Sequence, residues 1–360
     1  MLYEILYRLH SIYFPFNVFR YITFRTALAV VTASAVTFIL APFVIRRLRR
    51  FQFTQQIRED GPRTHFGKAG TPTMGGVLIL SSILLTVLLW MDLTNPYVWV
   101  LFFSTLFFGV IGFVDDYLKI KRQNHKGLRP CYKFGAQILV ATAVSMFLYL
   151  NPDDPYSSVL SVPFFKKWLI DLGYFYIPFS VFVMVGSSNA VNLTDGIDGL
   201  AIGLVAIAAL ANGMLVYISG NAKLAGYLQV LFLSGTGELT IFCGALFGAA
   251  LGFLWYNSYP ADLFMGDVGS LGLGGALGTL AVITKHEIVL AFVGGIFVIE
   301  TLSVIIQVAS YKITGRRVFR MAPIHHHFEE KGWEEPKTVV RFWIIGILLA
   351  LLSLATLKVR

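Results

Sequence analysis

The chain has 360 residues, of which 56% are apolar and only 14% are charged, and its mean hydropathy is +0.70. A soluble domain carries roughly 25% charged residues, so this composition excludes a soluble enzyme and predicts a protein that crosses a membrane several times. The net charge of +9 would suit nucleic acid, but the basic residues gather in a few loops beside apolar runs. We therefore expect a lipid bilayer as the partner and no nucleic acid.

Ten apolar runs are long enough to cross a bilayer as helices, which takes about 20 residues each. No short apolar core with a cleavage site precedes the first run, so we expect no signal peptide. No polar loop is long enough for a core of its own. The sequence thus predicts an all-α polytopic membrane protein with a single domain over residues 1–360. The expected spans are 22–45, 74–91, 97–117, 132–150, 173–188, 199–219, 237–255, 268–284, 287–309 and 339–358.

Helix packing has to hold this fold together. The only cysteines, Cys131 and Cys243, offer neither a disulfide framework nor a thiolate metal site. Small residues let membrane helices approach closely. We expect this of four glycines in the eighth span, namely Gly272, Gly274, Gly275 and Gly278.

The distribution of basic residues predicts the orientation in the membrane. Of the 29 Lys and Arg residues, 20 lie in the loops after the first, third and ninth spans and on their flanks. Cytoplasmic loops carry such an excess, so the odd-numbered loops are expected in the cytoplasm and both termini in the periplasm.

Two adjacent carboxylates, Asp115 and Asp116, end the third apolar run, and Lys119, Lys121 and Lys133 follow them. Ionised groups are costly in hydrocarbon, so a carboxylate pair at a helix mouth needs a cation or a function. A solvated helix end is the alternative. Carboxylates that can hold a hard cation here lie beside ammonium groups that can hold phosphate.

The loop after the fifth span contains Asn189, Asn192, Asp195 and Asp198, which recur every third residue. In helical geometry these side chains would share roughly one face. Alternatively, Thr194 or Asp195 caps the next helix. Capping explains one or two of these residues but not four, so we favour a functional interpretation.

The loop after the seventh span begins after Asn257 and contains Phe264, then Gly266, Asp267 and Gly269. Asp267 would serve as the N-cap of the eighth span or as a metal ligand. The glycines on either side remove side-chain bulk, as expected where a phosphate or a metal ion approaches the backbone.

Three consecutive histidines, His325, His326 and His327, lie in the loop after the ninth span. They are too crowded for all three to bind one metal ion, and at most two can reach a common ligand. Imidazole suits Zn²⁺ or Cu²⁺, whereas the carboxylate-rich remainder suits Mg²⁺ or Mn²⁺. We therefore interpret these histidines as phosphate donors or proton handlers.

Two further residues keep two interpretations each. Lys68 lies in a glycine-rich loop that would present it to an anion or draw it to anionic lipid headgroups. Glu300 lies in the middle of the ninth span, where it would be functional or a buried structural residue, and we favour the structural interpretation.

The polar motifs all fall in odd-numbered loops or at the ends of the spans beside them. They can therefore converge on one cytoplasmic site. Carboxylates with lysines suit phosphoryl transfer with Mg²⁺, between one lipid-borne and one soluble substrate. An ion-coupled transporter is the rival, but its site would lie at mid-membrane between inverted repeats, and no such repeat is visible.

The same motifs resemble the polyprenyl-phosphate sugar-1-phosphate transferases over essentially the whole chain. The resemblance rests on Asp115-Asp116, on the segment 189–199, on the segment 264–270 and on the segment 321–329. The last segment is similar to the muramoyl-pentapeptide branch of the family, in the bacterial inner membrane. That branch implies UDP-N-acetylmuramoyl-pentapeptide and undecaprenyl phosphate as substrates, with Mg²⁺ as the cofactor, and leaves a homodimer open.

The resemblance also implies roles for single residues. Asp267 would hold Mg²⁺, with Asp115 and Asp116 as further ligands or positioning groups, and His325 would complete the catalytic set. A phosphate monoester has a second pKa of about 6, so it scarcely needs a carboxylate as its base, and we favour positioning. Substrate binding would fall to Lys68, Lys119, Lys121, Lys133, Asn189, Asn192, Asp195, Asp198, Asn257, Phe264, His326 and His327.

Overall fold

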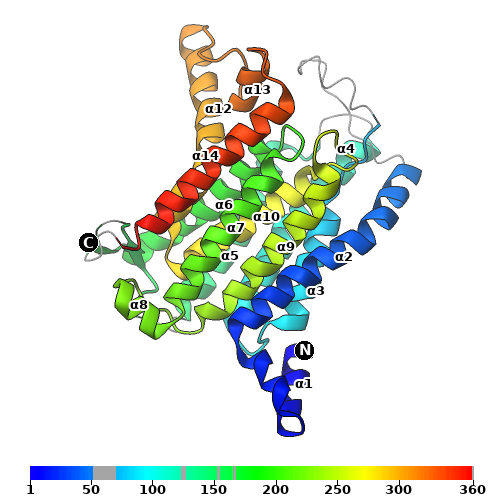
Figure 1. The fold of residues 1–360 in the computed structure, drawn as a ribbon. Coiled ribbons are helices and arrows are strands. Elements are labelled where there is room, and N and C mark those ends of the chain that lie inside the picture. The colour runs from blue at the N-terminus through cyan, green and yellow to red at the C-terminus, as the bar shows by residue number, and fades with distance from the viewer. Residues whose placement is uncertain (52–69, 123–126, 152–154, 164, 166–167, 359–360) are drawn as a thin grey trace.

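The computed structural model describes all residues except 52–69, 123–126, 152–154, 164, 166–167 and 359–360 (Figure 1). The described chain is built from helices, with one antiparallel hairpin of β1 (Val159–Ser161) and β2 (Leu169–Asp171). Its long helices are α2 (Ile22–Arg50), α3 (Gly76–Trp90), α4 (Pro96–Lys121), α5 (Pro130–Leu150), α6 (Tyr176–Thr194), α7 (Leu200–Ser219), α9 (Leu239–Asn257), α10 (Gly266–Thr284), α12 (Gly295–Thr314) and α14 (Glu335–Ala355).

Short helices connect or flank these long ones. They lie before the first span, in the loops and beside the longer helices. They are α1 (Leu2–Arg8), η1 (Leu9–Ser11), η2 (Phe14–Arg20), η4 (Gly173–Phe175), α8 (Ala222–Leu228), η5 (Thr236–Glu238), α11 (Glu287–Val293) and α13 (Ile324–Glu329).

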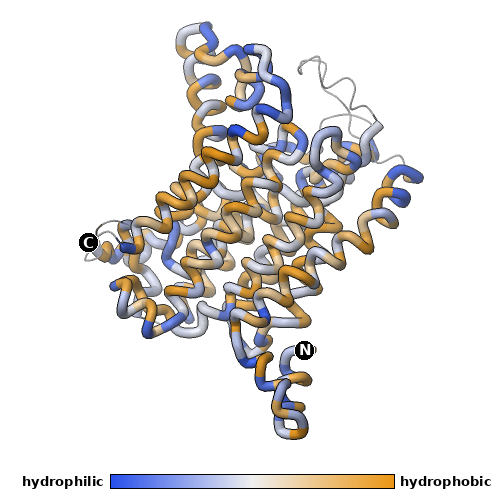
Figure 2. The backbone as a smooth tube through the Cα atoms, viewed as in Figure 1, coloured by the Kyte–Doolittle hydropathy of each residue, from blue (hydrophilic) through white to orange (hydrophobic). Residues whose placement is uncertain are grey.

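Nine of the ten expected spans each coincide with one long helix. Among the described residues, nine helices are long and apolar enough to cross a membrane, while α3 is apolar but has only 15 residues. Figure 2 shows apolar residues along the helices and polar residues toward their ends. The prediction of an all-α polytopic membrane protein is confirmed. The expected span 287–309 is instead divided into α11 and α12, because the helix breaks at Gly294.

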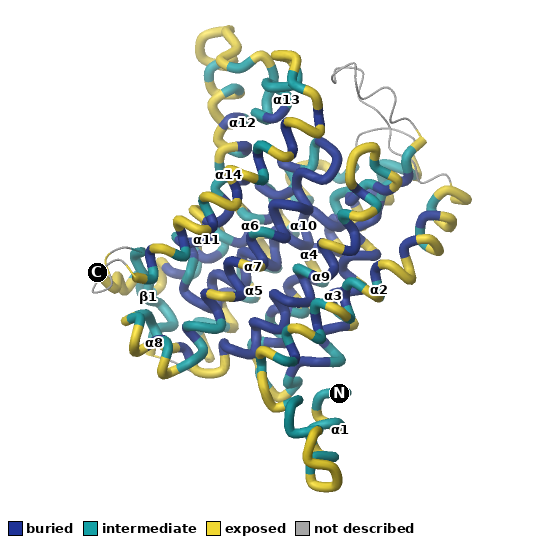
Figure 3. The backbone as a smooth tube through the Cα atoms, viewed as in Figure 1, coloured by how far each residue is buried: buried dark blue, intermediate teal, exposed yellow. Residues whose placement is uncertain are grey.

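Helix α10 lies at the centre of the bundle. Within its apolar stretch 89% of the residues are buried, compared with 17% in α5 and 22% in α12 (Figure 3). It packs against α3, α4 and α6, while α2 and α7 pack against α9. A Cβ atom on Gly274 would lie 2.5 Å from the carbonyl oxygen of Ser187 in α6, and one on Gly275 would lie 2.4 Å from the Phe108 ring in α4. The expected close approach at the α10 glycines is confirmed.

Helix α4 carries the two adjacent carboxylates to one end of the bundle. It begins where the side chain of Asn95 accepts a hydrogen bond of 2.9 Å from the amide of Tyr97, with Pro96 at the first helical position. The helix then runs for 26 residues, so Asp115 and Asp116 lie in its last two turns.

The motif-bearing loops gather at one end of the bundle. This end, here called the site end, holds the C-terminal end of α4, the N-terminal end of α10 and α13. The other end, here called the far end, holds α1, α8 and the hairpin (Figure 1). Helix α12 extends beyond the rest of the bundle at the site end, with α13 beside it. The described motifs that were expected on one side of a membrane thus lie at one end of the bundle.

Candidate active site

Three carboxylates meet at the site end. Asp115 and Asp116 come from α4, and Asp267 is the second residue of α10. One oxygen from each lies within 4.8 Å of the other two. Asp115 and Asp116 are only 3% and 4% exposed. Like charges this close repel one another unless cations lie between them.

Two lysines supply positive charge to this cluster. The Nζ atom of Lys119 lies 2.6 Å from Asp115 Oδ2, 3.2 Å from Asp116 Oδ1 and 3.0 Å from Asp267 Oδ2. Lys133 at the start of α5 places its Nζ 2.5 Å from Asp267 Oδ2. Lys119 reaches both carboxylates of α4 because residues three and four apart share a helix face. The cluster thus contains three acidic groups and two amino groups, so it carries net negative charge when all five are ionised.

Backbone contacts set the distance between α4 and α10. The carboxylate of Asp116 accepts a hydrogen bond of 3.2 Å from the amide of Val268, one of the amides that a helix start leaves unpaired. Gly266 has a φ of +70°, and a Cβ there would lie 2.5 Å from Asp116 Oδ2. A Cβ on Gly112 of α4 would lie 2.1 Å from the carbonyl oxygen of Asp267. Asp116 of α4 therefore contacts the N-terminal end of α10. Asp267 is not the N-cap of α10.

The two asparagines of α6 have different partners. Asn192 donates 2.9 Å to Asp267 Oδ1 and 2.8 Å to the hydroxyl of Ser270, so it joins the carboxylate cluster. Asn189 donates 2.7 Å to the side-chain oxygen of Gln137 in α5. Asn189 therefore connects α5 to α6 beside the site.

Asp195 and Asp198 follow the end of α6. Burial, followed by the nearby charges of Asp267 and Asp116, raises the pKa of Asp195 to about 8. Asp198 instead accepts 3.0 Å from the amide of Ala261, which joins two loops. The residue that caps α7 is Gly199, so the capping alternative for Asp195 is wrong.

Asn257 is a buried connection between two loops. Its Oδ1 accepts 3.1 Å from the amide of Gly199, and its Nδ2 donates 2.9 Å to the carbonyl of Leu263. The main chain of Phe264 pairs with the segment before α3, donating 2.9 Å to the carbonyl of Pro72 and accepting 2.8 Å from the amide of Gly75. These bonds hold the loop that leads into Asp267.

The three histidines have three different partners. His325 is fully buried, and its Nδ1 lies 3.1 Å from Glu300 Oε2. His326 Nδ1 lies 2.6 Å from Glu329 Oε2 in the same short helix. His327 Nδ1 accepts 3.0 Å from the amide of Arg320. Within the described part of the chain, neither ring nitrogen of His325 makes a hydrogen bond.

Some residues singled out in the sequence stay apart from the cluster, and others that matter were missed. Lys121 is exposed at the end of α4, and Lys68 lies outside the described residues. Glu335, at the start of α14, accepts 2.8 Å from the amide of Asp198. The pair Glu335-Pro336 is a helix-start signal in the sequence, but it does not point to that loop.

The buried set of carboxylates and lysines at the site end lies in a chain that matches known protein families. The family model of glycosyl transferase family 4 matches residues 98–285, so the chain belongs to that family. A phospho-N-acetylmuramoyl-pentapeptide-transferase signature matches residues 68–80. Proteins of that name from Thermodesulfovibrio yellowstonii, Citrifermentans bemidjiense and Pelobacter propionicus are 66%, 58% and 59% identical over the full length of both chains. The chain belongs to the phospho-N-acetylmuramoyl-pentapeptide-transferase family.

Proposed function

We propose that the protein transfers phospho-N-acetylmuramoyl-pentapeptide from its UDP derivative to undecaprenyl phosphate. The products are undecaprenyl-diphospho-N-acetylmuramoyl-pentapeptide, known as lipid I, and UMP. This is the first membrane step of peptidoglycan synthesis. The observation that carries the proposal is the meeting of Asp115, Asp116 and Asp267 with two lysines, in a chain 66% identical to a phospho-N-acetylmuramoyl-pentapeptide-transferase over its full length.

The residues at the cluster fit Mg²⁺. All three acidic groups offer hard oxygen donors, which Mg²⁺ prefers, and their close spacing suits one ion. The contacts of Lys119 and Lys133 support the same conclusion, because the carboxylates already accommodate positive charge. Asp267 would hold the ion, with Asp115 and Asp116 beside it. When bound, Mg²⁺ supplies neutralisation of negative charge on the diphosphate.

The reaction exchanges one phosphorus–oxygen bond for another. An oxygen of undecaprenyl phosphate attacks the phosphorus atom that is bonded to the sugar. The bond from this phosphorus to the bridging oxygen breaks, and UMP leaves with the electron pair. Lys119 and Lys133 stabilise the charge that develops on the transferring group.

Asp115 and Asp116 act by position rather than by proton removal. The acceptor phosphate has a second pKa of about 6, so it is mostly dianionic at neutral pH. Asp116 is held by the amide of Val268, and Asp115 Oδ1 accepts 2.7 Å from the amide of Leu128. Such bonds fix a carboxylate in one geometry, which suits a group that positions the reacting phosphate or would hold the metal ion.

The remaining residues bind and enclose the donor substrate. The basic residues steer the diphosphate, the histidines donate to phosphate or support the site, and the residues of two loops contact the uridine and sugar. In this assignment, His325 belongs to the catalytic set, and the binding residues are Lys68, Lys121, Asn189, Asn192, Asp195, Asp198, Asn257, Phe264, His326 and His327.

The site faces the cytoplasm from the inner membrane, with ten crossings and both termini in the periplasm. The described basic residues at the C-terminal ends of α2, α4 and α12 lie at the same end of the bundle as the carboxylate cluster, which supports this orientation (Figure 1). The test uses single cysteines in a background without Cys131 and Cys243. In intact cells a membrane-impermeant thiol reagent should label position 223 in α8 and spare position 317. The reverse pattern would contradict the orientation.

The activity is tested with purified protein in detergent. UDP-N-acetylmuramoyl-pentapeptide, undecaprenyl phosphate and Mg²⁺ should give UMP and a lipid-linked product. UDP-N-acetylglucosamine in place of the first substrate is the matched control and should give neither. A chain that releases UMP only from the control donor would assign the protein to a different sugar substrate.

A further inference from the structure

Glu300 and His325 form a buried contact that the proposed reaction does not yet use. The main-chain amide of His325 donates to Glu300 Oε2 over 3.5 Å, while neither ring nitrogen of His325 makes a hydrogen bond to the described residues. Both side chains are 0% exposed, and His325 Nδ1 lies 3.1 Å from Glu300 Oε2. Glu300 comes from α12 and His325 from α13, so the pair joins two helices. A buried carboxylate costs several kcal/mol of desolvation unless it is paired. The burial of Glu300 beside His325 therefore needs a structural or functional explanation.

The opposite edge of the His325 ring lies against the loop after α6. A Cβ added to Gly196 would lie 2.3 Å from His325 Nε2 and 2.8 Å from Cε1. Only glycine leaves room for the imidazole there. The ring thus touches the residue that directly follows Asp195.

Asp195 continues this line of contacts toward the carboxylate cluster. The main-chain amide of Gly266 is close enough to lower the pKa that burial raises at the Asp195 carboxylate, and Gly266 directly precedes Asp267. The contacts therefore run from α12 through His325 and the loop at 195–196 to the start of α10.

The segment that carries His325 is fixed to α12 at a second place. Gln307 of α12 accepts 3.0 Å from the amide of Val318 and 2.9 Å from the amide of Phe319, and it donates 2.9 Å to the Phe319 carbonyl. Because α12 extends beyond the bundle (Figure 1), its connections back to the loops at the site end depend on such contacts.

We propose that Glu300 is a positioning residue for the transfer: through the imidazole of His325 it holds the loop that carries Asp195 against the start of α10. A carboxylate 3.1 Å from Nδ1 favours the tautomer that carries its proton on this nitrogen and limits rotation of the ring. The ring then presses on Gly196 in a single position. This inference rests on the proposed function.

The decisive experiment is a double-mutant cycle on turnover with Glu300→Gln, His325→Asn and the double variant. Each single change should lower kcat about 10-fold or more, with KM for both substrates within about twofold of wild type. The double variant should be no slower than His325→Asn, because Glu300 acts only through that ring. Losses that multiply would overturn the proposal.

The chain contains a matched control in the neighbouring pair of His326 and Glu329. Glu329→Gln combined with His325→Asn should give losses that multiply, because Glu329 faces a different histidine. Equal non-additivity in this control would show that the cycle reports general damage, and the proposal would fail.

A second readout does not depend on activity. In protein labelled with ¹⁵N at histidine, the ring signals that disappear in His325→Asn belong to His325. Glu300→Gln should move these signals to the pattern of another tautomer, and it should leave those of His326 in place. Unchanged signals would overturn the proposal even if activity falls. If no UMP is formed by the wild type, the proposed function fails while this readout still tests the pair.

Gly196→Ala approaches the same contact from the other side, since its Cβ has to displace the ring. It should lower kcat like Glu300→Gln and add nothing to His325→Asn. If Glu300→Gln does not accumulate as folded protein, Gly196→Ala replaces it in the double-mutant cycle with His325→Asn. Losses in kcat that multiply in that cycle would also overturn the proposal.

Discussion

The two ends of the bundle both bury charged groups, but they balance them differently. At the far end, Arg25 of α2 makes two hydrogen bonds to Glu238, of 2.5 Å and 2.9 Å. Arg25 also donates 3.1 Å to the carbonyl of Trp90, and Glu238 accepts 2.7 Å from the amide of Asp92. One cation faces one anion, and backbone groups take up part of the remaining capacity.

At the site end the charges are not matched. Three carboxylates share two ammonium groups, and each lysine that reaches Asp267 also reaches Asp115. This difference distinguishes buried charges that serve packing from buried charges that serve a binding site. A one-to-one pair holds helices together, whereas an excess of carboxylates indicates a place for a further cation.

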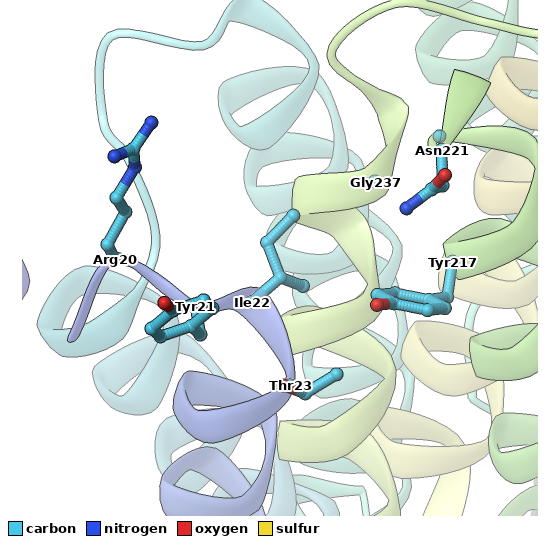
Figure 4. Close-up of a pocket in the computed structure, with 8 residues that line it drawn as sticks. Arg20, Tyr21, Ile22, Thr23, Tyr217, Asn221 and Gly237 are labelled. Carbon is cyan, nitrogen blue, oxygen red and sulfur yellow. The ribbon is translucent and has the colours of Figure 1, made fainter. Parts of the chain in front are cut away.

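The far end also contains a cavity. A cavity of about 340 Å³ there is lined by the residues drawn in Figure 4, which come from η2, α2, α7 and the segments around them. Among the described residues that line it, Arg20 alone is charged, and none is a carboxylate. Its lining is Arg20, Tyr21, Ile22, Thr23, Tyr217, Gly220, Asn221 and Gly237.

The largest effect on turnover is expected for Asp267→Asn. The change removes one charge of the proposed metal site while an amide can keep the contact with Asn192. We expect Mg²⁺-dependent kcat to fall by about 100- to 1,000-fold with a normal protein level. Asp262→Asn, an exposed carboxylate on the same loop, is the control and should be near normal. Near-normal activity of Asp267→Asn would remove the distinction between the two ends.

The next effect concerns Asp115→Asn and Asp116→Asn, measured separately from pH 6 to 9.5 at saturating Mg²⁺. If these carboxylates act by charge and position, the loss in kcat should be at least about 100-fold and persist at every pH. A carboxylate that served as the base would become dispensable at high pH, where the acceptor is fully deprotonated. Recovery in alkali for either variant would identify that residue as the base.

The far-end pair should affect stability and leave catalysis alone. Arg25→Met leaves Glu238 buried without its partner, which costs on the order of 3 kcal/mol in general. The melting temperature in detergent should fall, while kcat of the folded fraction stays within about twofold of wild type. The double variant Arg25→Met/Glu238→Met should melt closer to wild type than either single variant. A large fall in kcat would contradict a purely structural role.

The smallest effect is a pH dependence at the turn between α10 and α11. Burial lowers the pKa of His286 to about 4 from its ordinary value near 6.5. The unfolded chain therefore binds a proton more readily between these values, and the native state loses stability as the pH falls from 6.5 toward 4. The deficit in melting temperature of His286→Gln should shrink from pH 7.5 to pH 5. Ser219→Ala, which removes a hydroxyl 3.3 Å from His286 Nε2, should have a deficit that is constant over this range.

The proximity of Asp115 and Asp116 to Asp267 could be predicted from the number of membrane spans between them. Successive membrane spans alternate in direction, so motifs in odd-numbered loops come to the same side. The pattern of apolar runs also located every long helix. Neither inference needs to know which way a side chain points.

The partners of single side chains could not be predicted. The regular spacing predicted one shared helix face for Asn189, Asn192, Asp195 and Asp198. Helix α6 ends at Thr194, however, so Asp195 and Asp198 lie in the loop beyond it. Asp198 meets Ala261, and Asn257 meets Gly199, because two loops pack against each other. Such contacts depend on helix rotation and loop packing, which residue spacing within one segment does not determine.

The contact between Gly112 and the carbonyl of Asp267 has a consequence for mutational tolerance. A methyl group at this position would have to push α10 away from α4, although Gly112 itself has no chemical group to offer. In a library with every substitution at each residue, position 112 should accept glycine alone in a selection for activity. The intolerant area of this protein should therefore extend one helix turn beyond its carboxylates, along the line where the two backbones touch.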